Sequence, residues 1–427
     1  MKRVATLVAT PWIVALAVVS CSSGSDGDEG TPAGGSGGSG GVPGASGGAP
    51  TAPQGGSPSS GGIANTGGKS SVTPEGGVAS GGKSSAGGSA TTGGSDAGGE
   101  AGETSSNGGN DPGSGKHIEV RGRELYVDGE PFRIRGVNWN PVPKGGEHPA
   151  NLDYAGFADQ DIALMKAAGI NVVRTYERLE NRAVLDKLED AGIYVFSTVY
   201  GWWQDAPSVV TARVNAVKDH PAILAWVLGN EWNYNHLYAN DSLSLEETRD
   251  RINEAAELIR AADDEHPIST IYGELGGIEA QMAAMPNIDL WGVNAYRGIS
   301  FGDLFTQFAA ASTKPMYLGE YGADAYDSRN GGKVDVDAQG VATKALTEEI
   351  IDNYATPSGG TTLGGFVFEW ADEWWKGGDP DSHDTGGTAP GGGPYPDQTF
   401  NEEYWGVVDI DRVPRPAYDE LKALYAP

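Results

Sequence analysis

From about residue 116 to its end, the chain alternates short apolar runs with longer amphipathic segments. Eight of the apolar runs have the length and composition of buried β-strands, because they are short, rich in Val, Ile and aromatic residues, and bounded by polar or glycine positions. The predicted strands are Arg133–Asn138, Asn171–Tyr176, Tyr194–Tyr200, Ile223–Leu228, Ile268–Tyr272, Leu290–Ala295, Pro315–Leu318 and Gly365–Glu369.

Between these runs, apolar residues recur at the spacing of an α-helix, as in residues 157–169, 181–192 and 245–263. The first two of these segments end in glycine, which is typical of a helix C-terminus. A last helix is predicted over Ala417–Tyr425. Eight strand–helix units in about 290 residues predict an α/β fold, a (β/α)8 TIM barrel. A doubly wound parallel sheet is the structural alternative.

The first 115 residues follow a different pattern. Lys2 and Arg3 precede a mostly apolar run over residues 4–19, after which the sequence turns polar. This order is typical of a signal peptide, and the run is short for a helix that spans a membrane. Residues 22–115 are rich in Gly, Ser, Thr and Ala and contain no Trp, Tyr or Phe, so they cannot bury enough apolar surface to fold. We therefore predict a signal peptide over 1–21, a disordered tether over 22–115 and one barrel domain over 116–427.

Cys21 is the only cysteine of the chain and stands at the end of Val18-Val19-Ser20-Cys21. This tetrad resembles a bacterial lipobox, which implies cleavage before Cys21 and attachment of several acyl chains to it. Ser22 follows Cys21. In the proteins that the tetrad resembles, an Asp at this position keeps the lipoprotein from the outer membrane, so the resemblance implies sorting to the outer membrane. We expect an exported protein, anchored by lipid to the outer membrane or cell surface and touching the membrane through that anchor alone. An ordinary secretory peptide cut elsewhere is the alternative.

The charge and the scarce metal ligands exclude several functions. The net charge is −29, which repels nucleic acid and polyanionic substrates and favours neutral ligands. One cysteine permits neither a disulfide framework nor a cysteine-based metal site, and the six histidines form no HExxH pair. We expect no cofactor, no resident metal and a monomer, and we leave open a calcium site in the polar loop over residues 371–404.

Two glutamates stand where a barrel concentrates its chemistry. Glu231 follows the fourth predicted strand and Glu320 follows the seventh, and strand ends of a barrel meet at one rim. Two opposed carboxyl groups are what cleavage of a glycosidic bond requires. A structural carboxylate paired with an arginine is the alternative for each. Three more glutamates compete at strand ends without the same flanking residues: Glu177, Glu274 and Glu369.

With these residues the domain resembles the catalytic barrel of the retaining glycoside hydrolases of clan A, the 4/7 superfamily. Its opening, IEVRGRELYVDGEPFRIRGVNWNP, is similar to the entry into the first strand of that clan. The resemblance implies that Glu231 is the acid/base, that Asn230 contacts the sugar 2-hydroxyl, and that Glu320 is the nucleophile. It also implies that Arg174 and Tyr296 support the nucleophile. Within the clan, the residue pattern is most similar to those of family 2 β-glycosidases and β-1,3-glucanosyltransferases, although the chain lacks the cysteines of the transferases.

Tryptophans crowd the predicted rim, and their indole rings pack well on the C–H faces of pyranose sugars. The resemblance places Trp370 under the sugar in the −1 subsite. The other tryptophans expected to bind substrate are Trp139, Trp202, Trp203, Trp232 and Trp374. Packing in the barrel core is the alternative for each of them.

The sequence thus predicts a retaining β-glycosidase that hydrolyses a neutral β-linked oligo- or polysaccharide by double displacement. Retention requires the two carboxyl groups to lie about 5–5.5 Å apart. One alternative is a β-glucan transglycosylase with the same chemistry, and another is a non-catalytic, carbohydrate-binding barrel displayed on the cell surface. A metal-dependent barrel hydrolase is disfavoured by the missing histidine pairs.

Overall fold

Eight parallel strands close into a barrel in the computed structural model of the chain, which describes residues 116–426 except 240–241, 385–387 and 391–394. The barrel strands in chain order are β4 (Ile134–Asn138), β5 (Val172–Arg174), β6 (Tyr194–Tyr200), β7 (Ile223–Leu228), β8 (Ile268–Gly273), β9 (Leu290–Asn294), β10 (Met316–Tyr321) and β13 (Thr362–Val367). Strand β13 pairs with β4 and closes the ring. The predicted barrel is confirmed, and the doubly wound sheet is wrong.

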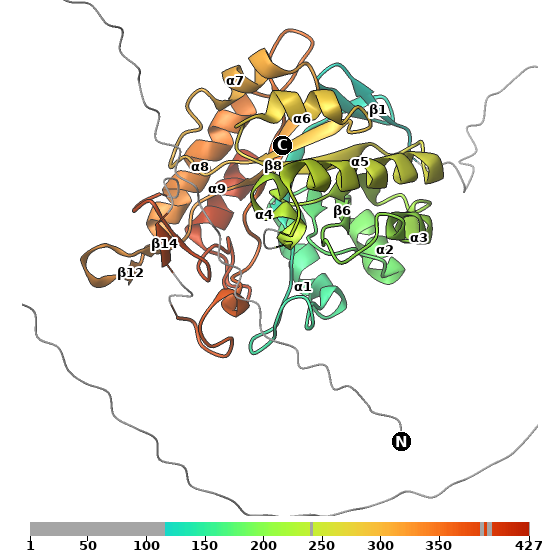
Figure 1. Cartoon of the computed structure of the whole chain (residues 1–427). Coiled ribbons are helices and arrows are strands. Elements are labelled where there is room, and N and C mark those ends of the chain that lie inside the picture. Colours follow the sequence, from blue (N-terminus) through green and yellow to red (C-terminus); the bar gives the residue numbers. More distant parts are fainter. Residues whose placement is uncertain (1–115, 240–241, 385–387, 391–394, 427) are drawn as a thin grey trace, which may run out of the picture. The chain divides into compact units, whose positions relative to one another are not determined.

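Helices follow the strands and surround the barrel (Figure 1). In the described part of the chain they are α1 (Tyr154–Ala167), α2 (Arg182–Ala191), α3 (Val209–Val217), α4 (Trp232–Asn235), α5 (Leu245–Ala262), α6 (Ile278–Ala284), α7 (Leu304–Ala311), α8 (Val336–Asp352) and α9 (Pro416–Leu424). Short 3-10 turns lie at η1 (His236–Tyr238), η2 (Arg329–Gly331) and η3 (Trp374–Lys376).

Local signals fix the ends of these helices. Asn181 caps α2 by accepting a hydrogen bond from the backbone of Ala183, and Gly192 ends that helix in the left-handed conformation, with φ 75°. Ser244 and Glu247 form a reciprocal capping box at the start of α5. Short polar and glycine-bearing sequences therefore set where each helix stops and the next strand begins.

A small antiparallel sheet closes the amino-terminal end of the barrel. It consists of β1 (Ile118–Arg121), β2 (Glu124–Val127) and β3 (Glu130–Phe132). Asp128 and Gly129 connect β2 to β3 with φ 52° and 85°, the left-handed pair that a tight hairpin requires. Leu125 and Val127 are buried in one cluster with side chains of the barrel interior. With this end filled, the carboxyl ends of the strands form the open mouth.

The polypeptide beyond β13 folds over the mouth with little regular structure. It contains η3 and the two-stranded sheet of β14 (Thr388–Pro390) and β15 (Thr399–Asn401). Another short ribbon, β11 (Tyr326–Asp327) with β12 (Lys333–Val334), follows β10. The predicted loop over residues 371–404 is therefore partly structured, and it brings charged side chains to the mouth.

The predicted signal peptide, the lipidated Cys21 and the tether over residues 22–115 lie outside the described residues. Within the described part, the helices are too short or too polar to cross a membrane.

Candidate active site

Four barrel strands deliver polar side chains to the mouth. Arg174 ends β5 and Asn294 ends β9, while Glu320 is the last residue but one of β10. Asn230 and Glu231 follow directly after β7 and the glycine at its end. Because parallel strands all point the same way, these five side chains converge although they are far apart in the sequence.

The carboxylate of Glu320 is held by three hydrogen-bond donors. Its Oε1 accepts from Arg174 Nη1 at 3.1 Å and from the Tyr176 hydroxyl at 2.7 Å. Its Oε2 accepts from the Tyr296 hydroxyl at 2.8 Å. The side chain is buried, with 6% of the residue exposed. Oε2 thus keeps a lone pair that these side chains do not occupy, and the carboxylate has one fixed orientation.

Both tyrosines are held in their protonated form. Burial and the adjacent Glu320 raise the pKa of Tyr176 well above its usual range. The same two causes raise the pKa of Tyr296. The raised pKa favours the protonated form of each hydroxyl, which can donate to Glu320.

Arg174 lies beneath the site and donates hydrogen bonds to several of its residues. It is fully buried, and Nη1 also donates to Asn138 Oδ1 and to the Gly319 carbonyl, both at 3.0 Å. Its Nη2 donates to Asn230 Oδ1 at 2.6 Å. The ion pair between Arg174 and Glu320 is thus part of a wider set of hydrogen bonds that Arg174 donates.

Glu231 lies in a contrasting environment. Gly229 and Glu231 both adopt left-handed backbone, with φ 71° and 46°, and this turns the chain sharply from β7 into α4. Such a conformation costs a non-glycine residue roughly 1–3 kcal/mol and is concentrated at functional sites. Burial, and then the charge of Glu320, raise the pKa of Glu231 to about 8. The raised pKa favours the protonated form of Glu231 at neutral pH, which is the form that a general acid needs.

Asn294 connects the two glutamates. Its Nδ2 donates to Glu231 Oε1 at 3.1 Å and to Asn230 Oδ1 at 3.2 Å. Because Asn230 also accepts from Arg174, which binds Glu320, one chain of hydrogen bonds runs between the two carboxyl groups. A shift of any member would disturb both carboxyl groups.

Sequence reasoning missed Tyr176 and Asn294, although a signal was present. Tyr176 lies two residues after Arg174, and Asn294 lies two residues before Tyr296. Residues two apart in extended chain point to the same side, so each lies beside a residue that the sequence had already indicated.

Phe368, directly after β13, packs beside the two tyrosines that bind Glu320, whereas Trp370, expected under the sugar, packs against α9. The Phe368 ring lies 6.4 Å from the rings of both Tyr176 and Tyr296, measured between centroids. Trp370 is buried, with 1% exposed, and its ring contacts Tyr418 of α9. The place of Trp370 under the sugar stays a prediction.

Trp139 and Trp232, which were expected on the rim, pack in the core. Both are fully buried. The indole N–H of Trp139 donates to Asp161 at 2.8 Å, and that of Trp232 donates to Thr270 at 2.9 Å. A buried indole keeps such an internal partner, which draws both rings inward.

The remaining tryptophans lie nearer the surface. Trp202 is partly buried, donates to Glu177 Oε1 at 2.8 Å and packs on Tyr238. Trp203 is 36% exposed. Trp374 is partly buried and stacks on His383. These three keep their place as proposed sugar-binding residues.

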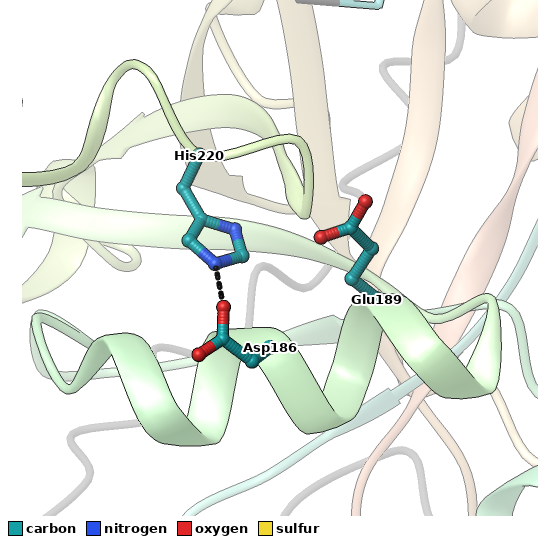
Figure 2. A group of neighbouring side chains, drawn as sticks. All are labelled: Asp186, Glu189 and His220. Carbon is teal, nitrogen blue, oxygen red and sulfur yellow. Dashed lines mark hydrogen bonds and ion pairs between the residues drawn. The ribbon is translucent and has the colours of Figure 1, made fainter. Parts of the chain in front are cut away.

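One group of side chains in the described part has the spacing of metal ligands, namely Asp186, Glu189 and His220 (Figure 2). His220 Nδ1 accepts a hydrogen bond from the backbone N–H of Ala222 at 3.2 Å, so its Nε2 carries the proton and donates to Asp186 Oδ1 at 3.0 Å. A protonated Nε2 cannot bind a metal ion. The group also lies just before β6 and β7, at the end of the barrel opposite the mouth.

Curated sequence relatives of the chain are β-galactosidases. The chain is 30% identical over 134 residues to a β-galactosidase of Pseudoalteromonas haloplanktis, a match that covers 27% of this chain and 12% of that protein. It is 28% identical over 151 residues to a β-galactosidase of Vibrio vulnificus strain YJ016, covering 30% of this chain and 14% of that one. The match thus spans about an eighth of the length of these relatives. No family model matches the chain.

Solved structures with a similar fold are named as β-glucuronidases and β-galacturonidases. The chain is similar to Bacteroides uniformis β-glucuronidase 2, with a TM-score of 0.56 and 17% identity over 73% of this chain and 37% of that one. A GH2 β-galacturonidase from Eisenbergiella tayi gives a TM-score of 0.51 and 19% identity over 73% of this chain and 54% of that one. The resemblance to glycoside hydrolases is confirmed by the named relatives and by the shared barrel.

Proposed function

We propose that the protein is a retaining β-glycosidase that hydrolyses a neutral β-linked glycan. The observation that carries this proposal is the contrast between two glutamates at one barrel mouth. Glu320 accepts three hydrogen bonds as a carboxylate, whereas burial and Glu320 raise the pKa of Glu231 to about 8. A nucleophile must be ionised and a general acid must carry a proton, so the two environments fit the two roles.

The first step breaks the glycosidic bond. Glu320 Oε2, which accepts one hydrogen bond where Oε1 accepts two, attacks the anomeric carbon. Glu231 gives its proton to the departing glycosidic oxygen, and the electron pair of the broken bond stays with that oxygen. The product of this step is an ester between the sugar and Glu320, together with the released alcohol.

The second step restores the enzyme. Glu231, now ionised, takes a proton from a water molecule that attacks the anomeric carbon, and the ester bond to Glu320 breaks. Two inversions give net retention of the anomeric configuration. If an acceptor sugar replaces the water, the same step yields transglycosylation.

A neutral substrate is supported by the charges around the site. Arg174 is neutralised by Glu320 at 3.1 Å. Lys376, a second cation near the mouth, contacts Glu373 at 3.3 Å and Glu402 at 3.5 Å. A substrate carboxylate would have to displace a protein carboxylate from one of them, against a net charge of −29. The uronic acids in the names of the structural neighbours are therefore not carried over to this chain.

Replacing each glutamate by alanine tests the assignment. Glu320→Ala should lose several orders of magnitude of rate on every aryl β-glycoside, because the attacking atom is gone. Glu231→Ala should lose most on substrates with poor leaving groups, and added azide should restore turnover as the β-glycosyl azide. Proton NMR of the first product reports the stereochemistry. An α-anomer formed first from a β-glycoside would show inversion and remove Glu320 from the role of nucleophile.

A further inference from the structure

A second group of charged side chains lies beside the two glutamates, in the chain that follows β13. Lys376 in η3 is at its centre, with Nζ 3.3 Å from Glu373 Oε2 and 3.5 Å from Glu402 Oε2. Glu402 comes from a distant part of the same segment, next to β15. Neither the hydrolytic steps above nor the sequence patterns assign any of these residues.

This group faces the same mouth as the catalytic pair. Lys376 Nζ lies 4.8 Å from the centre of the Phe368 ring, and that ring packs against Tyr176 and Tyr296, which bind Glu320. Glu402 is also among the groups whose charge raises the pKa of Glu231. The ammonium of Lys376 is therefore one aromatic ring away from the nucleophile.

Glu373 is buried and fully engaged within this group, whereas Lys376 and Glu402 are partly exposed. Glu373 is 3% exposed, and its Oε1 accepts from Asn140 Nδ2 at 2.6 Å. By contrast the side chains of Lys376 and Glu402 are 20% and 17% exposed. Their contact of 3.5 Å is longer than the 2.7–2.9 Å usual for a charge-assisted hydrogen bond. Glu373 thus holds Lys376 in place, and the Lys376–Glu402 pair keeps bonding capacity toward the mouth.

A donor beside an acceptor matches the hydroxyl groups of a sugar. An ammonium has three N–H donors and a carboxylate has only acceptors, so one hydroxyl can accept from Lys376 while its neighbour donates to Glu402. Phe368 is 6% exposed and the centre of its ring lies 4.8 Å from Lys376 Nζ, so the ring supports the ammonium from below. The carboxylates of Glu373 and Glu402 outnumber the single ammonium, which disfavours an anionic sugar.

We propose that Lys376 and Glu402 recognise two neighbouring hydroxyl groups of a neutral glycone bound at this side of the mouth. The proposal rests on the proposed glycosidase function and identifies the glycone hydroxyl groups that this side of the site binds. Glu373 acts through Lys376 and is a positioning residue.

The test pairs protein variants with deoxygenated substrates. Wild type, Lys376→Met and Glu402→Gln are assayed on 4-nitrophenyl β-glycosides of glucose, galactose, mannose and glucuronic acid, and then on monodeoxy forms of the best substrate. Hydrogen bonds to charged groups predict a loss of roughly 10- to 100-fold in kcat/KM for each variant on the full substrate. Removal of the recognised hydroxyl from the substrate should lower kcat/KM of the wild type by a similar factor. In the variant that lacks the partner of that hydroxyl, the same removal should lower kcat/KM little further.

Lys344→Met is the matched control, because Lys344 also pairs with a glutamate, Glu420 at 3.2 Å, but on the outer helices α8 and α9. It should leave kcat/KM unchanged, and thermal melting should show that all variants are folded. Equal losses on full and deoxy substrates would show a merely structural role and overturn the proposal. So would a glucuronide as best substrate, lost in Lys376→Met. A wild type that cleaves no glycoside would instead refute the glycosidase function itself.

Discussion

At the scale of single residues, the two glutamates lie in contrasting surroundings. Glu320 meets three donors, from Arg174, Tyr176 and Tyr296. Glu231 meets one side-chain amide, that of Asn294, and is otherwise desolvated beside a like charge. The chemistry of the site is therefore set by neighbours and not by residue type.

The first prediction at this scale concerns pH. Glu231 must be protonated to act as an acid, and its pKa is raised to about 8, so kcat/KM should be maintained below that pH and fall as pH rises through it. The measurement is a pH profile of kcat/KM for a substrate with a poor leaving group. In Glu231→Gln this alkaline limb should vanish with the rest of the acid catalysis. An identical limb in that variant would assign it to another group.

The same shift has a consequence for stability. The folded pKa of this carboxyl group lies above its unfolded value of 4.5. The group therefore disfavours folding at any pH where it is ionised in the unfolded chain but must keep its proton in the folded protein. Its contribution is neutral below the unfolded pKa and destabilising as pH rises toward 8. Glu231→Gln should therefore raise Tm at pH 8 more than at pH 4.5, as measured by calorimetry. A lower Tm at both pH values would mean that Glu231 stabilises the fold.

A third prediction concerns Tyr176. Tyr176→Phe removes the 2.7 Å hydrogen bond to Glu320 Oε1 but keeps the aromatic ring, so the nucleophile loses orientation while the packing stays. A fall of roughly 10- to 100-fold in kcat/KM follows from the usual strength of a hydrogen bond to a charged group. Tyr126→Phe is the control, since its hydroxyl contacts Glu124 on β2, far from the mouth. Equal activity of the two variants would refute the contribution of Tyr176.

At the scale of elements, the β1–β3 sheet acts as a plug and the segment after β13 as a wall. Leu125 of β2 is fully buried among side chains of the barrel interior. This packing closes one end, and the functional side chains all lie at the other. Stability and chemistry are thus carried by opposite ends of the same barrel.

The plug can be tested separately from the site. Leu125→Ala should lower the free energy of unfolding by about 2–5 kcal/mol, the usual cost of this truncation in a core. The turnover of folded enzyme should stay unchanged, because Leu125 lies at the opposite end. Urea unfolding gives the first quantity and active-site titration the second. Val341→Ala on α8, where the side chain is 54% exposed, should change neither.

At the scale of the whole molecule, we propose that the barrel is exported and held at the cell envelope through Cys21 and the segment over residues 22–115. The proposal rests on the lipobox-like tetrad and on a glycine-rich composition without aromatic residues. A long flexible tether would let the mouth reach glycans at a distance from the membrane.

A matched pair of chains tests this arrangement. Cys21→Ala should move the protein out of the membrane fraction or stall its processing. A chain that starts at Lys116 should be soluble, fold, and keep full activity on small substrates, because the closed barrel and its buried core lie within the described residues. Fractionation and Tm are the measurements. Wild-type protein found soluble and without lipid would refute the anchor, and a large loss of Tm would refute the tether.

The sequence by itself determined the barrel and part of its site. Apolar runs of strand length, separated by helical patterns with clear stops, leave few ways to bury every apolar face, so the eight strands were predictable. Once the strands are placed, polar residues at their ends must share a rim. The amino-acid pattern alone therefore groups Glu231 and Glu320 at one end of the barrel, and the resemblance to clan A adds Arg174, Asn230 and Tyr296.

Tertiary structure alone decided which aromatic ring lies at the site and which charges surround it. Phe368 and Trp370 are two positions apart and would lie on one face of an extended strand, but β13 ends at Val367, so the irregular path after the strand sets where each ring packs. Lys376 and Glu402 meet across a long, weakly patterned segment, whose path is set by contacts with the barrel. Local sequence carries strand and helix periodicity, but such meetings depend on the folded chain as a whole.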